Sequence, residues 1–319
     1  MKTTLAITGG TGFIGRHLAR RLTEEGYRLR CLVRRTSDIT YLNSLGVELV
    51  YGDITEEKTL PDLLHQVEAV FHLAGQVSVS QSIEDPSSAF FTNAVGTLKL
   101  LEILRSNNRT DCLVVYLSSD RVYGDSKSEL VAELALTVPL EPYAASKLCA
   151  EHLCHSYSKA YSIPFVILRG ANVYGPGQSS KLFIPSIIQQ IVSGEKHVSV
   201  GNLDNYRNFI YVEDVVDALY LALSRGNQIK NETFNIAGQG AKLRVITDIF
   251  SRLSLKYLGK AFQVTQEPSL VRPSEVEGRR YQLDCSKAHE LLGWSPKYSL
   301  EKGLDETLRL SLAERKVRI

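Results

Sequence analysis

The sequence has little of what marks membrane proteins, nucleic-acid-binding proteins or disulfide-rich secreted proteins. Its 37 Lys and Arg nearly balance 35 Asp and Glu, giving a formal net charge of +2 over 319 residues. A chain this close to neutral is not expected to grip nucleic acid or an anionic membrane. No apolar run approaches the roughly 18 to 20 residues that cross a bilayer. The N-terminal segment reaches a glycine cluster where a signal peptide would stay hydrophobic, so we expect a cytoplasmic protein with small-molecule partners.

Cysteine is also scarce. The five cysteines are odd in number and contain no C-x-x-C pair, which argues against a disulfide framework. Cys149, His152, Cys154 and His155 lie close together in the chain. On a helix this spacing cannot aim all four side chains at one point, so no metal site is predicted. With 10 Pro, 22 Gly and 44% hydrophobic residues, the composition is that of an ordinary globular protein.

Short apolar runs separated by helical patterns fill the first half of the chain. The runs are too short for helices and lie at residues 3–8, 29–35, 47–53, 69–75, 113–119 and 165–170. Strands that are apolar on both faces and alternate with helices are typical of a parallel sheet covered by helices. The sequence therefore predicts an α/β fold with a doubly wound, Rossmann-type parallel sheet.

The pattern loosens after this half of the chain into turn-rich segments and separate helices. We expect residues 1–169 to form the nucleotide-binding domain and residues 170–319 mainly a smaller C-terminal substrate-binding α/β domain, with a cleft between them. An amphipathic helix and a following strand predict that residues 210–240 return to the first domain. Trp294 is expected to anchor the small domain.

Gly9, Gly12 and Gly15 stand as G-x-x-G-x-x-G between the first predicted strand and the first helix. Small residues in this position let the backbone approach a pyrophosphate held at the helix N-terminus. The spacing departs from the G-x-G-x-x-G dinucleotide fingerprint. A glycine turn that only begins a helix therefore stays open as the alternative.

The end of the second predicted strand carries Arg34 and Arg35, where an acidic residue would bind the ribose hydroxyls of NAD. A guanidinium can pair bidentately with a 2′-phosphate, so we expect NADP as the cofactor, with NAD as the alternative. Solvated surface arginines are the other interpretation. Asp53, which closes the third predicted strand, is expected either to accept a hydrogen bond from the adenine amino group or to cap the next turn.

Tyr143 and Lys147 are four residues apart in YAASK, which places them on one face of a helix that Pro142 opens. A lysine ammonium beside a phenol favours the phenolate. We expect it to lower the pKa of Tyr143, so that the hydroxyl can exchange a proton with a sugar hydroxyl. The pair follows a strand that ends in Ser118 and Ser119, at the carboxyl edge where open α/β sheets bind ligands.

Together these segments resemble the extended short-chain dehydrogenase/reductases, specifically the nucleotide-sugar epimerase and dehydratase family. The resemblance rests on TGGTGFIG at 8–15, HLAG at the end of the fourth strand, SSDRVYG at 118–124 and PYAASK at 142–147, and NVYGPG, RNFIYVEDVV and RPSEVEGRRY match as well. It implies a homodimer built on a helix pair that includes residues 147–160. It also implies that the cofactor contacts Gly9, Gly12, Phe13, Ile14, Gly15, Arg34, Arg35, Asp53, Ile54, Leu73, Ala74, Gly75, Asn93, Tyr143 and Lys147.

The same resemblance assigns roles at the site. It implies that Ser119 hydrogen-bonds the sugar oxygen, that Tyr143 is the acid/base, and that Lys147 holds the nicotinamide ribose. A nucleotide-sugar substrate would be held by Ser119, Asn172, Arg207 and Arg272, with the two arginines at the diphosphate. A planar guanidinium with five donors suits that duty.

Residues 119–121 depart from the pattern of the family's dehydratases, which often have Thr-Asp-Glu where this chain has Ser119, Asp120 and Arg121. Asp120, a further catalytic candidate, could protonate a leaving 6-hydroxyl, but Arg121 is a poor base for a C5 proton. Simple 4-epimerases, in turn, usually carry a small residue where Asp120 stands. We expect 4-epimerisation of an NDP-hexose, with NADPH-dependent reduction of an NDP-4-keto-6-deoxy sugar as the main alternative. The sequence favours a 4,6-dehydratase or a non-catalytic NADP sensor less than these two functions.

Overall fold

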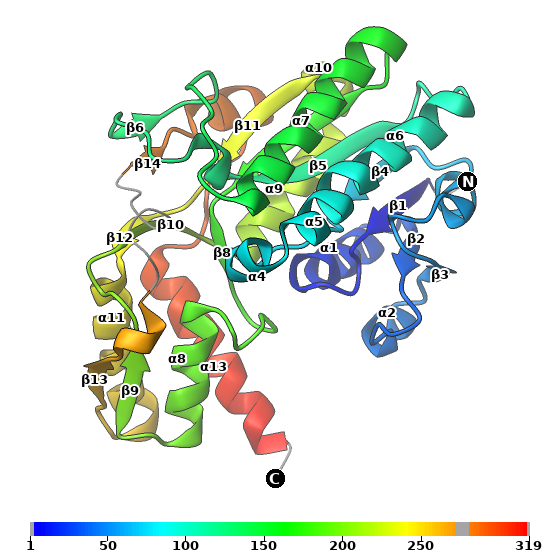
Figure 1. Ribbon diagram of the computed structural model, residues 1–319. Helices are drawn as coiled ribbons and strands as arrows, with labels where there is room; N and C mark the ends of the chain where they lie inside the picture. Colours follow the sequence, from blue (N-terminus) through cyan, green and yellow to red (C-terminus); the bar gives the residue numbers. More distant parts are fainter. Residues whose placement is uncertain (1–2, 272–280, 318–319) are drawn as a thin grey trace.

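A seven-stranded sheet forms the centre of the computed structural model, which describes residues 3–271 and 281–317 (Figure 1). Its order is β11-β7-β5-β4-β1-β2-β3, and every pairing is parallel. This confirms the predicted doubly wound α/β fold. The order reverses between β1 and β4, where such sheets bind nucleotides. The strands are β1 Thr4–Thr8, β2 Arg28–Val33, β3 Glu48–Tyr51, β4 Ala69–His72, β5 Leu113–Ser119, β7 Phe165–Gly170 and β11 Glu232–Ile236.

Helices cover both faces of the sheet, and side chains of successive strand residues enter different cores. Leu5 and Ile7 of β1 pack with α1 and α9, whereas Ala6 between them packs with α6 and α7. This alternation explains why the strands are apolar on both faces. The helices of this lobe are α1 Phe13–Glu24, α2 Thr40–Ser44, α3 Leu60–Leu64, α4 Val79–Glu84, α5 Pro86–Phe90, α6 Gly96–Ser106, α7 Pro142–Tyr161, α9 Val212–Ser224 and α10 Gly226–Ile229.

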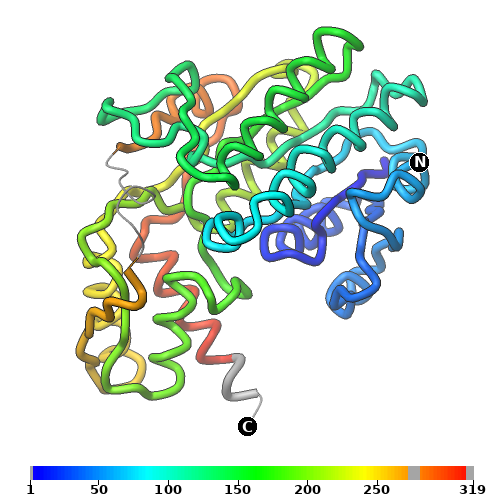
Figure 2. Tube along the Cα trace, viewed as in Figure 1, coloured from blue at the N-terminus to red at the C-terminus, as the bar shows by residue number. Residues whose placement is uncertain are grey.

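A second lobe lies beside the sheet (Figure 2). It has its own apolar core, which includes Ile187, Phe250 and Leu304. The chain crosses between the lobes more than once, since β11 pairs with β7 and α9 packs against α1. The division at residues 169 and 170 stays a prediction. The elements outside the central sheet and its helices are β6 Leu130–Val131, β8 Asn172–Tyr174, α8 Phe183–Ser193, β9 His197–Val200, β10 Tyr206–Tyr211, β12 Gly240–Lys242, α11 Leu243–Leu258, β13 Gln263–Gln266, β14 Gln282–Leu283 and α13 Leu300–Val317.

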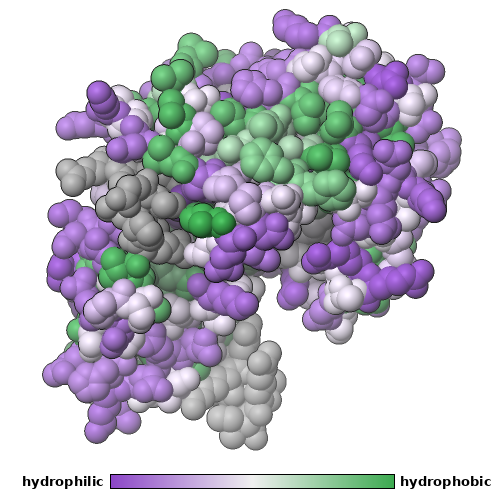
Figure 3. Space-filling view, viewed as in Figure 1, coloured by the Kyte–Doolittle hydropathy of each residue, from purple (hydrophilic) through white to green (hydrophobic). Residues whose placement is uncertain are grey.

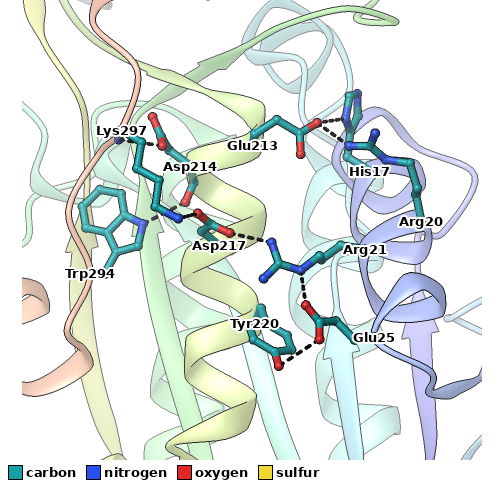
Figure 4. Close-up of polar contacts among 10 residues, drawn as sticks. All are labelled: His17, Arg20, Arg21, Glu25, Glu213, Asp214, Asp217, Tyr220, Trp294 and Lys297. Atoms are coloured by element: carbon teal, nitrogen blue, oxygen red, sulfur yellow. Dashed lines mark hydrogen bonds and ion pairs between the residues drawn. The ribbon is translucent and has the colours of Figure 1, made fainter.

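The placement expected for Trp294 is wrong. Its indole is 2% exposed and belongs to the core of the sheet lobe, not to that of the second lobe. The indole N–H donates to the Asp214 carbonyl oxygen at 2.8 Å, and the Asp214 carboxylate accepts from the Lys297 backbone N–H at 2.8 Å (Figure 4). A buried indole needs such an acceptor, and the first turn of α9 supplies it.

Ion pairs join α1 to α9 along the outer side of this core. The Glu213 carboxylate lies 2.7 Å from His17 Nδ1 and 2.8 Å from an Arg20 guanidinium nitrogen (Figure 4). One turn further, Arg21 donates to Asp217 at 2.8 Å. These contacts hold the helix that follows the glycine loop against the returning segment.

Three predicted strands extend too far at their carboxyl ends. β2 ends at Val33, β3 at Tyr51 and β4 at His72, so Arg34, Arg35, Asp53 and residues 73–75 lie beyond the strands. Polar residues at a strand end can belong to the strand or to the loop, and the sequence pattern alone does not separate the two.

Among the described residues, no helix is both long enough and apolar enough to span a membrane.

Candidate active site

The glycine loop leaves no room for side chains. Gly9 has φ +77°, and a Cβ there would lie 2.7 Å from the Ala74 backbone nitrogen and 2.9 Å from the Leu73 carbonyl oxygen. A Cβ on Gly15 would lie 2.2 Å from the Gly9 carbonyl oxygen. No side chain caps α1 at Gly12. At Gly9 and Gly15 the loop therefore has room for backbone alone, next to a helix N-terminus, which fits a dinucleotide pyrophosphate.

Asn93 shapes the neighbouring loop after β4. It lies in a π-helical turn, Phe91–Val95, and its amide donates to Ser146 Oγ at 2.8 Å and accepts from the Gln76 N–H at 2.8 Å. A Cβ on Gly75 would lie 2.8 Å from the Asn93 amide oxygen. Asn93 thus connects the predicted cofactor loop to the helix that carries Tyr143 by hydrogen bonds. Its π-helical turn is of a kind that often occurs at functional sites.

His72 at the end of β4 has a structural role. Its two ring nitrogens lie 2.8 Å from Thr8 Oγ1 and 2.9 Å from Thr97 Oγ1. Burial lowers the pKa of the imidazole to about 3, and the Lys147 charge adds to the effect. The ring is therefore neutral, and Thr97 passes the hydrogen-bond chain on to the Asn93 carbonyl oxygen at 2.6 Å.

Arg34 and Arg35 are exposed beyond β2, where an adenosine 2′-phosphate would lie. The acidic residue that follows them, Asp38, accepts from the Thr40 backbone N–H at 3.0 Å, and this hydrogen bond lowers its pKa. The positive charge of Arg16 also lowers that pKa, and Arg16 Nε donates to the Thr11 carbonyl oxygen at 2.9 Å. The fold thus adds a third arginine, from α1, which the sequence analysis did not single out.

Asp53 and Ile54 serve local structure. The Asp53 carboxylate accepts from the Thr55 N–H at 3.0 Å and from the Thr55 hydroxyl at 2.7 Å, which is the capping role expected as one of two possibilities. Ile54 is 4% exposed. A Cβ on Gly96 would lie 3.1 Å from its side chain. The adenine contact of Asp53 stays a prediction.

Ser119, Tyr143 and Lys147 meet at the carboxyl end of β5. Pro142 is the first residue of α7, and the spacing of four places Tyr143 and Lys147 on the buried face, 9% and 4% exposed. Lys147 Nζ donates to the Leu117 carbonyl oxygen at 2.8 Å and lies 4.7 Å from the centroid of the Tyr116 ring. The structure therefore brings three of the four predicted catalytic residues together.

The electrostatics of Tyr143 differ from the prediction. Burial raises the pKa of the phenol to about 12, while a hydrogen bond with Ser119 and the charge of Arg121 oppose the rise. Burial lowers the pKa of Lys147 to about 8, partly offset by the Glu151 carboxylate. The groups that favour the phenolate are thus Ser119 and Arg121, because the ammonium turns instead to the backbone of β5.

Asp120 and Arg121 follow directly in a 3-10 turn, Asp120–Tyr123. Ser119 Oγ lies 3.4 Å from Asp120 Oδ1 and accepts from the Arg121 backbone N–H at 3.2 Å. The Arg121 guanidinium lies 3.4 Å from Glu141 Oε1, with the two side chains only 10% and 2% exposed. Glu141 Oε2 also accepts from the Ala144 N–H at 3.1 Å and so caps the catalytic helix. A buried carboxylate that the sequence analysis missed therefore stands beside Tyr143.

The second lobe supplies part of the predicted substrate site. The Asn172 amide donates to the Asn208 carbonyl oxygen at 2.9 Å. Arg207 is 8% exposed, and its guanidinium donates to the Tyr206 carbonyl oxygen at 2.9 Å. Arg272 lies outside the described residues.

No group of three or more His, Cys, Asp or Glu side chains among the described residues could hold a metal ion.

Comparison with known proteins decides the family. A family model described as GDP-mannose 4,6 dehydratase matches residues 6–307, which is nearly the whole chain. The chain belongs to the nucleotide-sugar epimerase/dehydratase family of extended short-chain dehydrogenase/reductases. This confirms the resemblance drawn from the motifs. It establishes an NAD(P)-dependent oxidoreductase of the nucleotide-sugar type.

Members with different reactions are similar to this chain over almost its full length. The dTDP-glucose 4,6-dehydratase of Haemophilus influenzae (strain ATCC 51907 / DSM 11121 / KW20 / Rd) is 31% identical to this chain, and the alignment covers 96% of each protein. A UDP-glucose 4-epimerase from Thermotoga maritima superposes with TM-score 0.87 and 29% identity, over 99% of this chain and 100% of that one. A Streptomyces venezuelae dTDP-glucose 4,6-dehydratase with NAD bound gives TM-score 0.88 and 28% identity, over 99% and 98%.

Proposed function

We propose that this chain is a 4,6-dehydratase of an NDP-hexose. The observation that carries the proposal is Asp120, a buried carboxyl group beside the Ser119 hydroxyl, where an epimerase needs no acid. The curated dehydratase relatives support it. The 4-epimerase expected from the sequence becomes the second candidate.

The site residues divide the reaction among them. A bound nicotinamide would take hydride from C4 and return it to the same sugar. Tyr143 accepts the C4 hydroxyl proton while Ser119 holds that oxygen. Asp120 then donates its proton to the 6-oxygen as the C5 proton leaves, so that one water is lost. A proton finally returns to C5, and the product is an NDP-4-keto-6-deoxy sugar.

The C5 proton needs an acceptor that Arg121 cannot provide, because a guanidinium stays charged in proteins. Glu141 is the carboxylate that the fold brings to the guanidinium from twenty residues further along the chain. We assign Glu141 as the base, with the Arg121 guanidinium holding the carboxylate in place. A carboxylate from the N-cap of α7 would then replace the glutamate that dehydratases often carry at position 121.

The second candidate is 4-epimerisation. It requires that Glu141 only caps α7 and that Arg121 only pairs with Glu141. Ser119, Tyr143 and Lys147 then suffice to oxidise C4 and to reduce it again from the other face. The two reactions differ in their products. We would incubate the protein with a panel of NDP-hexoses and with NDP-4-keto-6-deoxy sugars, with and without NADPH. A product lighter by one water supports the dehydratase, an isomer of equal mass the epimerase, and net NADPH oxidation a ketoreductase.

We further propose NADP as the cofactor, on Arg34 and Arg35 just beyond β2 and Arg16 on α1. One charge-assisted contact contributes about 1.5 to 3 kcal/mol, so Arg34→Ala and Arg35→Ala are each expected to weaken NADP binding roughly tenfold or more and to spare NAD. Titration calorimetry with both cofactors measures this. Arg28→Ala, exposed at the other end of β2, is the matched control. Equal losses for NADP and NAD would remove the 2′-phosphate argument.

A homodimer and a cytoplasmic location belong to the proposal as well. Apolar side chains gather over α5, α6 and α7 (Figure 3), and Phe91 and Tyr161 are 54% and 43% exposed there. A second copy of the chain would cover this helix face. Tyr161→Asp is expected to convert the dimer to a monomer in light scattering, whereas Leu136→Asp, 79% exposed elsewhere, is not. A dimer that survives Tyr161→Asp would contradict this interface.

A further inference from the structure

A second polar layer lies behind the catalytic residues. Glu151 on α7 and Arg169 on β7 form a buried ion pair, with side chains 2% and 8% exposed. Arg169 Nη2 donates to Glu151 Oε2 at 2.6 Å, and Arg169 Nε lies 3.1 Å from both carboxylate oxygens. Two charges taken out of water are costly to keep unless the geometry compensates. This pair has the bidentate geometry that does so.

The Glu151–Arg169 pair contacts the end of β5 next to the catalytic residues. Ser118 Oγ donates to Glu151 Oε1, next to the Leu117 carbonyl oxygen that accepts from Lys147. Lys147 and Glu151 are one helical turn apart on α7, and they hydrogen-bond the neighbouring β5 residues Leu117 and Ser118. The next residue on the strand is Ser119. The two hydrogen bonds therefore fix the position of the end of β5 relative to α7.

On its other side Arg169 reaches the segments that lead to the second lobe. One of its nitrogens donates to the Tyr123 hydroxyl at 2.8 Å, and that hydroxyl donates to Asn235 Oδ1 at 2.6 Å. The Asn235 amide donates to the Val131 carbonyl oxygen at 2.9 Å and to the Asp284 carbonyl oxygen at 3.1 Å. The network therefore runs from α7 through the sheet to β6 and the end of β14.

We infer that Glu151 is a positioning residue of the active site, which holds Lys147 charged and keeps Ser119 in register with Tyr143, with Arg169 as its anchor. The inference rests on the proposed oxidoreductase function. It concerns residues to which none of the roles above was assigned. Glu151 does not touch substrate and acts through Lys147 and Ser118.

Electrostatics give this role a pH signature. The Glu151 carboxylate opposes the effect of burial on Lys147, whose pKa is about 8. Without that carboxylate, burial and the unpaired Arg169 charge would lower the Lys147 pKa further. Lys147 would then lose its proton, and the enzyme its activity, at a lower pH. The titratable and charged groups that surround Lys147 and its partners include Tyr143, Cys149, Glu151, Cys154 and His155 on α7, Tyr116 on β5, Tyr123 in the turn after it, His72 on β4 and Arg169 on β7.

Glu151→Gln tests the inference through pH profiles of kcat/KM and of NADPH affinity measured by fluorescence. The alkaline limb of both profiles is expected to move at least about one unit lower, so that the ratio of the variant's value to the wild-type value falls at least about sixfold between pH 6.5 and pH 8.5. Glu151→Asp keeps the charge and is expected to keep the wild-type limb. Glu301→Gln, which breaks a surface ion pair with Arg252, is the control for loss of a glutamate.

A purely structural role predicts something else. Glu151→Gln and Glu151→Asp would then lose the same activity and stability at every pH, with unchanged limbs, and this result would overturn the inference. If Glu151→Gln does not fold, the Glu151→Gln/Arg169→Gln double variant, which removes both charges of the pair, must still shift the limb downward. The NADPH profile needs no sugar. Failure of the proposed reaction on the sugar panel therefore leaves this test intact, and an unshifted limb in an active enzyme refutes only the role of Glu151.

Discussion

Tyr143→Phe is expected to lower turnover by at least about a hundredfold, the range that general acid/base catalysis contributes. The substitution removes one oxygen and leaves the ring in its buried place on α7. Without the hydroxyl, nothing at Ser119 can take the proton from the C4 hydroxyl as hydride leaves. Steady-state kinetics on the best sugar of the panel measures the effect.

Folding should change little in this variant. The hydrogen bond with Ser119 is lost, which costs about 1 kcal/mol of the free energy of unfolding. Tyr220→Phe on α9, whose hydroxyl lies 3.4 Å from a Glu25 oxygen, removes a tyrosine hydroxyl remote from β5 and should keep full activity. Near-normal turnover in Tyr143→Phe would sink the acid/base assignment.

The second large effect concerns the loss of water. Asp120→Asn keeps the shape of the side chain but cannot donate a proton to the 6-oxygen, so we expect dehydration to fall by about a hundredfold or more. Glu141→Gln keeps the cap of α7 yet cannot accept the C5 proton, and an equally large loss is expected. Oxidation at C4 needs neither carboxylate, so both variants should still reduce the bound nicotinamide, visible by absorbance.

The contrast between the two half-reactions is what identifies these carboxylates. Asp125→Asn, at an exposed position just beyond the same turn, is the matched control and should leave both half-reactions unchanged. If Asp120→Asn and Glu141→Gln cost only a few-fold in turnover and the product keeps the mass of the substrate, the reaction is epimerisation. The dehydratase proposal is then wrong.

Local sequence predicted much of the fold because the sheet is buried on both faces. The strands at 113–119 and 165–170 have the predicted bounds, since each is a continuous apolar run. The motif Pro142–Lys147 fixed the face of α7 through the helical spacing alone. Where polar residues continue a strand, as at Arg34 and Arg35, the pattern could not tell strand from loop.

The residues that the sequence analysis missed depend on contacts between distant segments. Glu141 and Arg121 are twenty positions apart and meet only because α7 begins beside the turn after β5. Arg16 lies on α1, far in the sequence from Arg34 and Arg35. Arg169 lies within the predicted apolar strand 165–170, and its partner Glu151 lies on the predicted helix that carries Tyr143. Spacing rules within one element carry no information on such pairs.

The pKa of Tyr143 shows the same limit for electrostatics. Spacing predicted that Lys147 would favour the phenolate, but it contained nothing about the Leu117 carbonyl oxygen that accepts from the ammonium. It also did not reveal how deeply the phenol is buried. The direction of the shift follows from burial, which only the fold determines.

The path of the C4 hydrogen tests the central claim most directly. The protein would be incubated with the best NDP-hexose of the panel carrying deuterium at C4, and the product examined by NMR. A dehydratase that returns the hydride to the same sugar predicts a 4-keto-6-deoxy product with the deuterium on C6. Deuterium found again at C4 of an epimeric hexose would contradict the claim.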